Sequence, residues 1–361
     1  MKDKKRVGFL SYWGFGKGIA YDTLCFSKML ISDYDIYILK QGDNEDGEEF
    51  KKVDVNIQIC DKYTIESDVF RKWVKDNKLD AVVFNEYNQW LKDPVSLVKI
   101  AKEEGAKTYG FLIWEKLSHI SLFDDYDKII APTVSYERYL RKNKIRNFVY
   151  IPMSVDLEEF PKKESKLGDK FVFFHPGGWG GYKNRKCTQE VISAFMRLNR
   201  QDTELIITAQ KKMEYDKSKL PSNIKIINED LSRKDLIKIF YESNAVVLPS
   251  KWETIGIPIL EAMAAGKPVI TNDVPPMNEF VKEGLNGYLC RPEMTTYKDV
   301  FVGVAIPDET DLKNKMENVT NKILYPLLAK NARYIAESMY DIKKNKKYFI
   351  DSLKEVLQWI K

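Results

Sequence analysis

Apolar strands that alternate with amphipathic helices constrain the fold of this chain more than any other feature. Runs such as Ala81 to Asn85 are short and apolar, and segments between them, such as Ile19 to Leu30, have helical spacing. This order predicts a parallel sheet covered by helices on both faces. The pattern starts again at Phe171, so we predict an α/β fold with two Rossmann-like domains. The predicted strands are Arg6 to Ser11, Tyr34 to Leu39, Asn56 to Cys60, Ala81 to Asn85, Lys107 to Leu112, Lys128 to Ala131, Phe148 to Ile151, Phe171 to His175, Glu204 to Thr208, Ile224 to Ile227, Ala245 to Pro249 and Pro268 to Thr271.

The length of 361 residues also predicts two domains, because single cores rarely grow beyond about 250 to 300 residues. Pro152 to Pro161 ends the first series of strands, and Lys162 to Lys170 is a charged linker. We place a first domain at residues 1–165 and a second at 166–335. Helical spacing after Asp341 predicts that residues 336–361 form a C-terminal helix.

Composition favours a cytoplasmic protein. No apolar run reaches the roughly 18 residues that span a bilayer, and the charged start leads directly into the strand at Val7. The four cysteines show no C-x-x-C spacing, so we expect reduced thiols rather than disulfides or a zinc site.

The formal net charge is +5, and basic residues crowd one segment. This segment is either a solvated helix face or a patch that attracts anionic lipid, which would hold the protein peripherally on the inner face of the membrane. Nothing in the sequence resembles a nucleic-acid-binding signature, so no nucleic acid is expected as a partner. The basic residues are Arg138, Arg141, Lys142, Lys144 and Arg146.

Two carboxylates eight residues apart lie in the stretch that follows the predicted strand Asn244 to Leu248. Glu253 falls in the loop, and Glu261 falls in the first turn of the helix that Gly256 and Pro258 are expected to start. Free N–H groups at a helix start favour a phosphate, and carboxylates accept hydrogen bonds from sugar hydroxyls. One loop can therefore hold both halves of a sugar nucleotide. For Glu261 the alternative is a carboxylate that stabilises the helix N-terminus.

Pro249 to Ile270 resembles the E-x7-E signature of retaining GT-B glycosyltransferases of family 4. Thr254 and Ile255 depart from it, since Gly or Ser and then Phe are usual at these positions. The resemblance implies two facing Rossmann-like domains, with a C-terminal helix that crosses back to the first domain. It also implies retaining, metal-independent transfer of a hexose-type sugar from a nucleotide diphosphate sugar. No cofactor is expected besides this co-substrate.

The resemblance implies roles for individual residues. Lys183 matches the lysine that contacts the donor diphosphate, whereas Gly178 or Trp179 stands where an arginine is usual, and Arg185 is a candidate substitute. An exposed first helical turn is the alternative for Arg185 and Lys186. We assign catalysis to Glu253 and Lys183, and donor binding to Glu261, Arg185, Gly256, Ile257, Thr254 and Gly178.

The glycine-rich loop Gly14 to Gly18 follows the first strand, and it includes Gly16 and Lys17. Such a loop is also typical of a dinucleotide site, but no acidic residue ends the second strand. The resemblance places Gly16, Lys17 and Gly18 near the donor diphosphate and the acceptor.

Glu115 and Glu86 are candidates to orient the acceptor hydroxyl, with a plain strand-end carboxylate as the alternative for each. The histidine that many relatives carry in this region is absent, and His119 lies a few residues on. His119 and His175 are the only histidines, so the sequence argues against a histidine-based metal centre or a Ser-His-Asp triad. Asp125-Tyr126-Asp127 looks like the D-x-D of metal-dependent transferases, but we expect it on a surface turn.

The predicted partners are a nucleotide sugar donor and a glycan, lipid-linked or small-molecule acceptor, in a process such as polysaccharide biosynthesis. Two rivals stay open: a catalytically silent homologue that acts as a binding subunit, and a sugar-nucleotide epimerase on the same fold. Retention of Glu253, Glu261 and Lys183 argues against the silent homologue.

Overall fold

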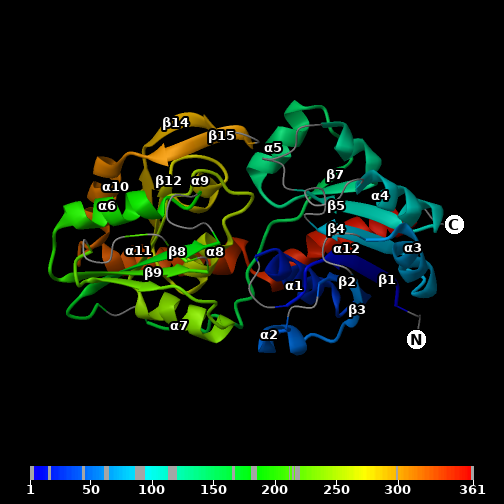
Figure 1. Cartoon of the computed structure of the whole chain (residues 1–361), viewed down its shortest axis with the longest axis horizontal. Coiled ribbons are helices and arrows are strands. Elements are labelled where there is room, and N and C mark those ends of the chain that lie inside the picture. The colour runs from blue at the N-terminus through cyan, green and yellow to red at the C-terminus, as the bar shows by residue number, and fades with distance from the viewer. Residues whose placement is uncertain are drawn as a thin grey trace. The chain divides into compact units, whose positions relative to one another are not determined.

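The computed structural model describes residues 4–14, 18–42, 45–60, 65–85, 94–112, 120–164, 167–179, 185–210, 212–213, 215, 220–297 and 300–358. Its contacts divide the chain into two compact units, and Figure 1 shows their elements. Unit 1 comprises Met1–Ser154 and Ile342–Lys361, and unit 2 comprises Val155–Asp341. The predicted boundaries near residues 165 and 335 both lie inside unit 2.

Unit 1 is built on a seven-stranded sheet in the order β3-β2-β1-β4-β5-β6-β7, with every pair parallel. Chain order reverses beside β1, which lies between β2 and β4. The central strand β4 is buried along its whole length, whereas most of the edge strand β3 is exposed. The strands are β1 (Arg6–Ser11), β2 (Asp35–Gln41), β3 (Asn56–Cys60), β4 (Ala81–Asn85), β5 (Lys107–Phe111), β6 (Lys128–Ala131) and β7 (Phe148–Tyr150).

The helices of unit 1 begin where capping side chains and apolar spacing allow. Thr133 precedes α5, and its side chain accepts a hydrogen bond from the backbone N–H of Tyr136 at 3.1 Å. In α3, Phe70, Trp73 and Val74 are buried on one face. The helices are α1 (Gly18–Leu30), α2 (Glu48–Lys51), α3 (Ser67–Asp76), α4 (Pro94–Glu103), the 3-10 helix η3 (Ile120–Asp125), α5 (Val134–Lys142) and α12 (Ile342–Gln358).

The last of these helices, α12, packs on α1 and β5 (Figure 1). The buried ring of Phe349 lies 5.4 Å from that of Phe26 and 6.0 Å from that of Tyr109. The Tyr109 hydroxyl donates to the backbone carbonyl of Ser352 at 3.1 Å. A C-terminal helix on the first unit was expected, and α12 belongs to that unit.

Unit 2 is built on a six-stranded parallel sheet in the order β10-β9-β8-β11-β12-β13. Here chain order reverses beside β8. Phe173, Leu205, Val247 and Ile270, one from each of four strands, belong to one buried apolar cluster with residues of the helices. The strands are β8 (Phe171–Gly178), β9 (Thr203–Ala209), β10 (Ile224–Ile227), β11 (Ala245–Leu248), β12 (Val269–Asn272) and β13 (Gly287–Cys290).

Two antiparallel strands, β14 (Pro292–Tyr297) and β15 (Val300–Pro307), follow the sheet of unit 2 as a hairpin. The hairpin is hydrogen-bonded to the loop after β11: the backbone N–H of Ala305 donates to the carbonyl of Lys251 at 2.9 Å. The Asn272 side-chain amide also donates to the Ala305 carbonyl at 3.2 Å. The helices of unit 2 are α6 (Thr188–Leu198), α7 (Arg233–Glu242), α8 (Ile257–Ala264), α9 (Met277–Phe280), α10 (Glu309–Val319) and α11 (Tyr325–Met339).

The prediction of two parallel-sheet, Rossmann-like domains is confirmed. Five of the twelve predicted strands agree with the structure at both ends: β1, β3, β4, β6 and β10. The strands β13, β14 and β15 were not predicted. At β13 the chain runs so close to β12 that a Cβ atom on Gly287 would lie 2.0 Å from the Val269 carbonyl oxygen, so this strand begins on a glycine instead of an apolar side chain.

Candidate functional site

The topology of unit 2 brings two loops together at the carboxyl end of its sheet. In an open α/β sheet, ligands bind outside the carboxyl ends of the strands where chain order reverses. That point lies between β8 and β11. The segment after β8 leads to Arg185 and Lys186, and the segment after β11 carries Glu253.

Glu253 lies at the centre of a compact charged cluster. Its carboxylate Oε2 is 2.7 Å from a guanidinium nitrogen of Arg185, and its Oε1 is 2.5 Å from Nζ of Lys186. Both Glu253 and Lys186 are buried, whereas the Arg185 side chain is 32% exposed. Lys186 therefore does not lie on an exposed helical turn, which was the alternative for this residue.

The charges in this cluster depend on one another. Burial alone would raise the pKa of Glu253, but the cations of Arg185 and Lys186 lower it to about 2. Burial lowers the pKa of Lys186, although Glu253 opposes this shift. The Glu253 carboxylate is thus ionised at neutral pH and holds two cationic side chains at one place.

Backbone contacts fix the loops that carry this cluster. The N–H of Lys251 donates to the carbonyl of Arg185 at 2.7 Å. The side-chain amide of Asn272, on β12, donates to the carbonyls of Pro249 and Ser250 at 3.1 Å each. Cys187 takes a left-handed conformation with φ +56°, which turns the chain from Lys186 into α6. The segment of Arg185 and Lys186 is therefore hydrogen-bonded to the loop that carries Glu253, and this loop is hydrogen-bonded to β12 of the sheet.

Glu261 lies in α8, the helix that follows the loop of Glu253. It is 5% exposed, and its Oε1 forms an ion pair with a guanidinium nitrogen of Arg233, the first residue of α7. The helix starts as predicted, at Gly256 with Pro258 in its first turn. Gly256 has φ +91°, a conformation that favours glycine. Glu261 was expected in the first turn, but it is the fifth residue of α8 and lies beyond that turn, with a buried cation as its partner.

Thr254 and Ile257 flank this helix start, and Thr254 is buried while Ile257 is partly exposed. At the end of β8, Gly178 has φ +52°, and a Cβ atom there would meet nothing within 4 Å. These residues share the carboxyl end of the unit 2 sheet with Glu253.

His175, inside β8, has a structural position. Its Nδ1 lies 2.7 Å from the Val247 carbonyl, which can only accept a hydrogen bond, so Nδ1 carries the proton. Its Nε2 lies 2.9 Å from the Thr188 hydroxyl and accepts from it. Burial lowers the pKa of His175 to about 4, so the ring is neutral at physiological pH. It ties β8 to β11 and to the start of α6.

Several predicted site residues lie outside the described residues: Lys183, Gly16, Lys17 and Glu115, together with the candidate Glu86. His119 also lies outside them. Gly18 is described, and it is the exposed first residue of α1 in unit 1.

The D-x-D-like triplet has a structural role in unit 1. The Asp127 carboxylate accepts hydrogen bonds from the N–H of Thr108 at 2.8 Å and from the Thr108 hydroxyl at 2.9 Å. Tyr126 is 5% exposed, so this residue is not on a plain surface turn as expected. Among the described residues, no group of three or more His, Cys, Asp or Glu side chains is placed to hold a metal ion.

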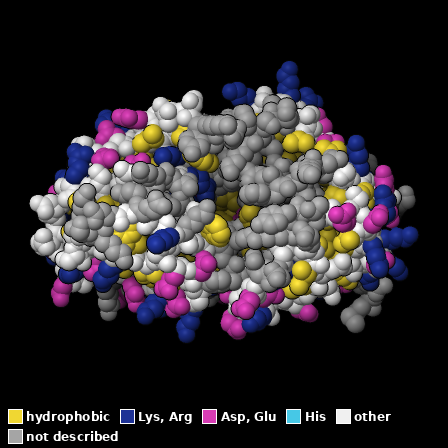
Figure 2. Space-filling view, viewed as in Figure 1, with side chains coloured by type: hydrophobic (Ala, Val, Ile, Leu, Met, Phe, Trp, Pro, Cys, Tyr) yellow, Lys and Arg dark blue, Asp and Glu magenta, His cyan; other side chains and the backbone are white. Residues whose placement is uncertain are grey.

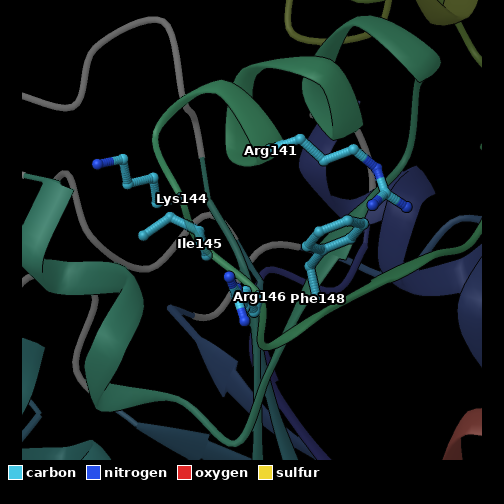
Figure 3. A pocket seen from close by; sticks show the side chains of 5 residues that line it. All are labelled: Arg141, Lys144, Ile145, Arg146 and Phe148. Carbon is cyan, nitrogen blue, oxygen red and sulfur yellow. The ribbon is translucent and has the colours of Figure 1, made fainter.

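The predicted basic patch lies at the C-terminal end of α5, and Figure 2 shows Lys and Arg side chains over this region at the top of the view. A cavity of about 450 Å³ is lined by Arg141, Lys144, Ile145, Arg146 and Phe148. The Arg141 guanidinium lies 4.9 Å from the centre of the Phe148 ring, while Lys144 extends away from that ring (Figure 3). Arg141 also pairs with Glu137 at 2.7 Å. The described helices include none long and apolar enough to cross a membrane.

Two residues of the site were missed by sequence reasoning. For Lys186 the sequence predicts only a place in a helical turn, and for Arg233 it predicts no role in the site. Charge alternation gave no signal for either residue, because their partners are 67 and 28 residues away in the chain. A basic residue just before the helix that follows the first strand of an α/β domain is the signal that could have indicated Lys186.

Part of unit 2 matches a known protein family. Residues 156–300 match the family described as Glycosyl transferases group 1. These residues contain Arg185, Lys186, Glu253 and Glu261. The chain is 30% identical over 191 residues to the Escherichia coli UDP-Gal:alpha-D-GlcNAc-diphosphoundecaprenol alpha-1,3-galactosyltransferase, with 48% of this chain and 49% of that protein covered. The match thus spans about half of that relative, and still less of several other curated relatives.

Solved structures extend the likeness to the whole fold. Sucrose-phosphate synthase from Thermosynechococcus elongatus superposes with a TM-score of 0.75 at 13% identity, covering 99% of this chain and 100% of that one. HepE from Anabaena, solved with UDP and glucose, has a TM-score of 0.71 at 15% identity, covering 97% and 100%. The chain therefore has the GT-B fold seen in glycosyltransferases, and within it residues 156–300 match the group 1 family.

Proposed function

We propose that this protein is a retaining, metal-independent glycosyltransferase that moves a hexose-type sugar from a nucleotide diphosphate sugar to an acceptor hydroxyl. The charged cluster of Glu253, Arg185 and Lys186 carries this proposal. It holds a carboxylate and two cations at the carboxyl end of the unit 2 sheet, where an α/β domain binds its ligand. In the transition state, a carboxylate stabilises the positive charge that develops on the sugar, and cations stabilise the negative charge of the diphosphate leaving group.

In this proposal the cations act on the leaving group. Arg185 and Lys186 stabilise the negative charge that grows on the diphosphate as the glycosidic bond breaks. Lys183, expected from the family resemblance, would act with them. Glu253 contacts the transferred sugar and stabilises its positive charge, while Glu261 accepts hydrogen bonds from the ribose. An oxygen of the donor phosphate removes the acceptor proton, so no separate base is required.

The donor is a UDP-sugar in our proposal, and the acceptor is lipid-linked. The support comes from the Escherichia coli relative, whose name specifies UDP-Gal and a diphosphoundecaprenol acceptor, and from HepE, which was solved with UDP and glucose. The basic patch on α5 supports attachment to an anionic membrane surface from the cytoplasmic side. Each Lys or Arg near such a surface contributes about 1 kcal/mol.

A donor screen tests the reaction. UDP-, GDP- and ADP-hexoses are incubated with undecaprenyl-diphosphate-linked sugars or with none, and release of free nucleotide and transfer of sugar are measured. We expect acceptor-dependent release from a UDP-hexose. Rearrangement of the donor without transfer would indicate the epimerase instead, and binding of nucleotide without turnover would indicate the silent homologue.

Two variants test the assigned roles. Glu253→Gln removes charge that acts in the transition state, so kcat should fall about 100-fold or more while donor KM changes little. Glu261→Ala should instead raise the donor KM. Glu204→Gln is the matched control, since Glu204 pairs at 2.7 Å with the exposed Lys225. A folded Glu253→Gln protein with the turnover of the wild type would contradict the proposal.

A further inference from the structure

Arg233 lies buried between two carboxylates of unit 2. One guanidinium nitrogen forms the ion pair with Glu261. The Nε atom and the other terminal nitrogen both contact Oε2 of Glu159, at 2.9 and 2.8 Å. The Arg233 side chain is only 8% exposed, and those of Glu159 and Glu261 are 16% and 6% exposed. The fork of the guanidinium group thus joins two acidic residues that are distant in sequence.

The position of Arg233 is itself fixed by its surroundings. Its guanidinium carbon lies 5.3 Å from the centre of the Phe160 ring. The backbone of this segment is anchored in turn, because Arg333 donates to the Phe160 carbonyl at 2.5 Å and the Tyr241 hydroxyl donates to the Pro161 carbonyl at 2.6 Å. The planar guanidinium group of Arg233 is bonded to Glu159 on one edge and covered by the Phe160 ring on one face, so it has little freedom to rotate.

We propose that Arg233 is a positioning residue of the donor site, which orients the Glu261 carboxylate for the ribose of the nucleotide. This inference rests on the proposed function, because it requires that Glu261 binds the donor. The Glu261 side chain has several rotatable bonds. If Arg233 holds it in one conformation before the donor binds, less side-chain entropy is lost on binding. Arg233 contacts Glu261 through Oε1, and we assign Oε2 to the ribose hydroxyls.

The inference predicts a specific kinetic pattern. Arg233 contacts Glu261, Glu159 and the ring of Phe160. Its loss should therefore act on donor binding through Glu261, without a matching loss in the chemical step. Glu159 holds Arg233 from the other side, so Glu159→Gln should have a smaller effect in the same direction. Because Arg233 acts through Glu261, its substitution should have no further effect once the Glu261 carboxylate has been removed.

The experiment measures UDP affinity by calorimetry, and donor KM and kcat by nucleotide release, for Arg233→Met, Arg233→Lys and Glu159→Gln. We expect Arg233→Met to weaken UDP binding about tenfold and to raise the donor KM equally, with kcat within about threefold of wild type. Arg233→Lys keeps the charge but loses the fork, and should recover part of the affinity. Lys234→Met is the matched control, because Lys234 is the exposed next residue of α7, and it should bind UDP as the wild type does.

A double-mutant cycle with Glu261→Ala separates positioning from a purely structural role. We expect Glu261→Ala and Glu261→Ala/Arg233→Met to have the same UDP affinity. Wild-type affinity in Arg233→Met with only a lowered melting temperature would overturn the inference, and so would additive losses in the cycle. If Arg233→Met does not fold, the same cycle is run with Arg233→Lys and Glu159→Gln. Failure of the wild-type protein to bind any nucleoside diphosphate would overturn the proposed function as well, and is distinguished by that measurement.

Discussion

Substitution of Glu253 by glutamine should destabilise unit 2 by an amount that depends on pH. The change leaves Arg185 and Lys186 beside a neutral amide in a buried place. The pKa of Glu253 is lowered from 4.5 to about 2 in the folded protein. At about 1.4 kcal/mol per pH unit, the ionised carboxylate contributes about 3 kcal/mol at pH 7. Loss of one partner from a buried ion pair has a similar cost, of about 3 to 5 kcal/mol.

The sign of the pH effect follows from the lowered pKa. Stability from the carboxylate is fully present above pH 4.5, the usual value, and is lost as pH falls toward 2. The difference between wild type and Glu253→Gln should therefore be about 3 kcal/mol at pH 7 and roughly half of that at pH 3. Unfolded-state protonation of Glu253 is the reason for the decrease.

Urea unfolding at several pH values measures this difference, with circular dichroism and tryptophan fluorescence as two probes. The two units can unfold in separate transitions, so the free energy of unfolding is taken from the transition that Glu253→Gln shifts. Glu204→Gln is the control, and its cost should stay below about 1 kcal/mol, as is usual for a pair with an exposed lysine. Equal urea midpoints for Glu253→Gln and wild type at pH 7, or a difference as large at pH 3 as at pH 7, would refute the reasoning.

Four further predictions use other parts of the structure. The folded pKa of His175 is about 4, below the 6.5 of an unfolded histidine, so stability should fall as pH drops from 6.5 to 4; urea titrations of His175→Gln should lack that contribution, and an unchanged pH profile would contradict it. Activity should survive dialysis against EDTA, because Arg185 and Lys186 supply the cations for the diphosphate; loss of turnover with rescue by manganese would show otherwise. The product should keep the anomeric configuration of the donor, as proton NMR of the first product can show, and a β-linked product from an α-donor would exclude the retaining mechanism. Co-sedimentation with anionic liposomes should exceed that with neutral ones and weaken with salt, and the Arg146→Glu/Lys144→Glu protein should lose the difference, whereas equal binding to both would exclude a role for the α5 patch.

Much of the fold could be predicted because its signals are local. Strands such as β4 and β10 are short, mainly apolar runs, and their limits agree with the prediction at both ends. The helix start at Gly256 and Pro258 was likewise predicted from two neighbouring residues. The hairpin β14–β15 was not, because most of β14 that the structure describes is exposed and carries no buried alternation.

The pairings within the candidate site could not be predicted in the same way. Sequence reasoning could place Glu253 after a strand and Arg185 before a helix, because each position depends on its own neighbours. Which cation pairs with which carboxylate depends on the parallel pairing of β8 with β11, and on the left-handed conformation of Cys187 next to Lys186. Cysteine is no signal for such a turn, since glycine and asparagine are the residues that usually adopt it. The buried pair of Arg233 and Glu261 depends in addition on the packing of two helices.

The place of α12 in unit 1 has a consequence for the synthesis of the protein. A ribosome makes the seven strands of unit 1 first, then the whole of Val155–Asp341, and only then the helix that covers Phe26 and Tyr109. Domains generally fold as they emerge, from the N-terminal end onward. Here unit 2 is one continuous segment and can complete its core while the nascent first unit still exposes an apolar face. That face is the surface on which chaperones should act during translation, although it is formed from the earliest part of the chain.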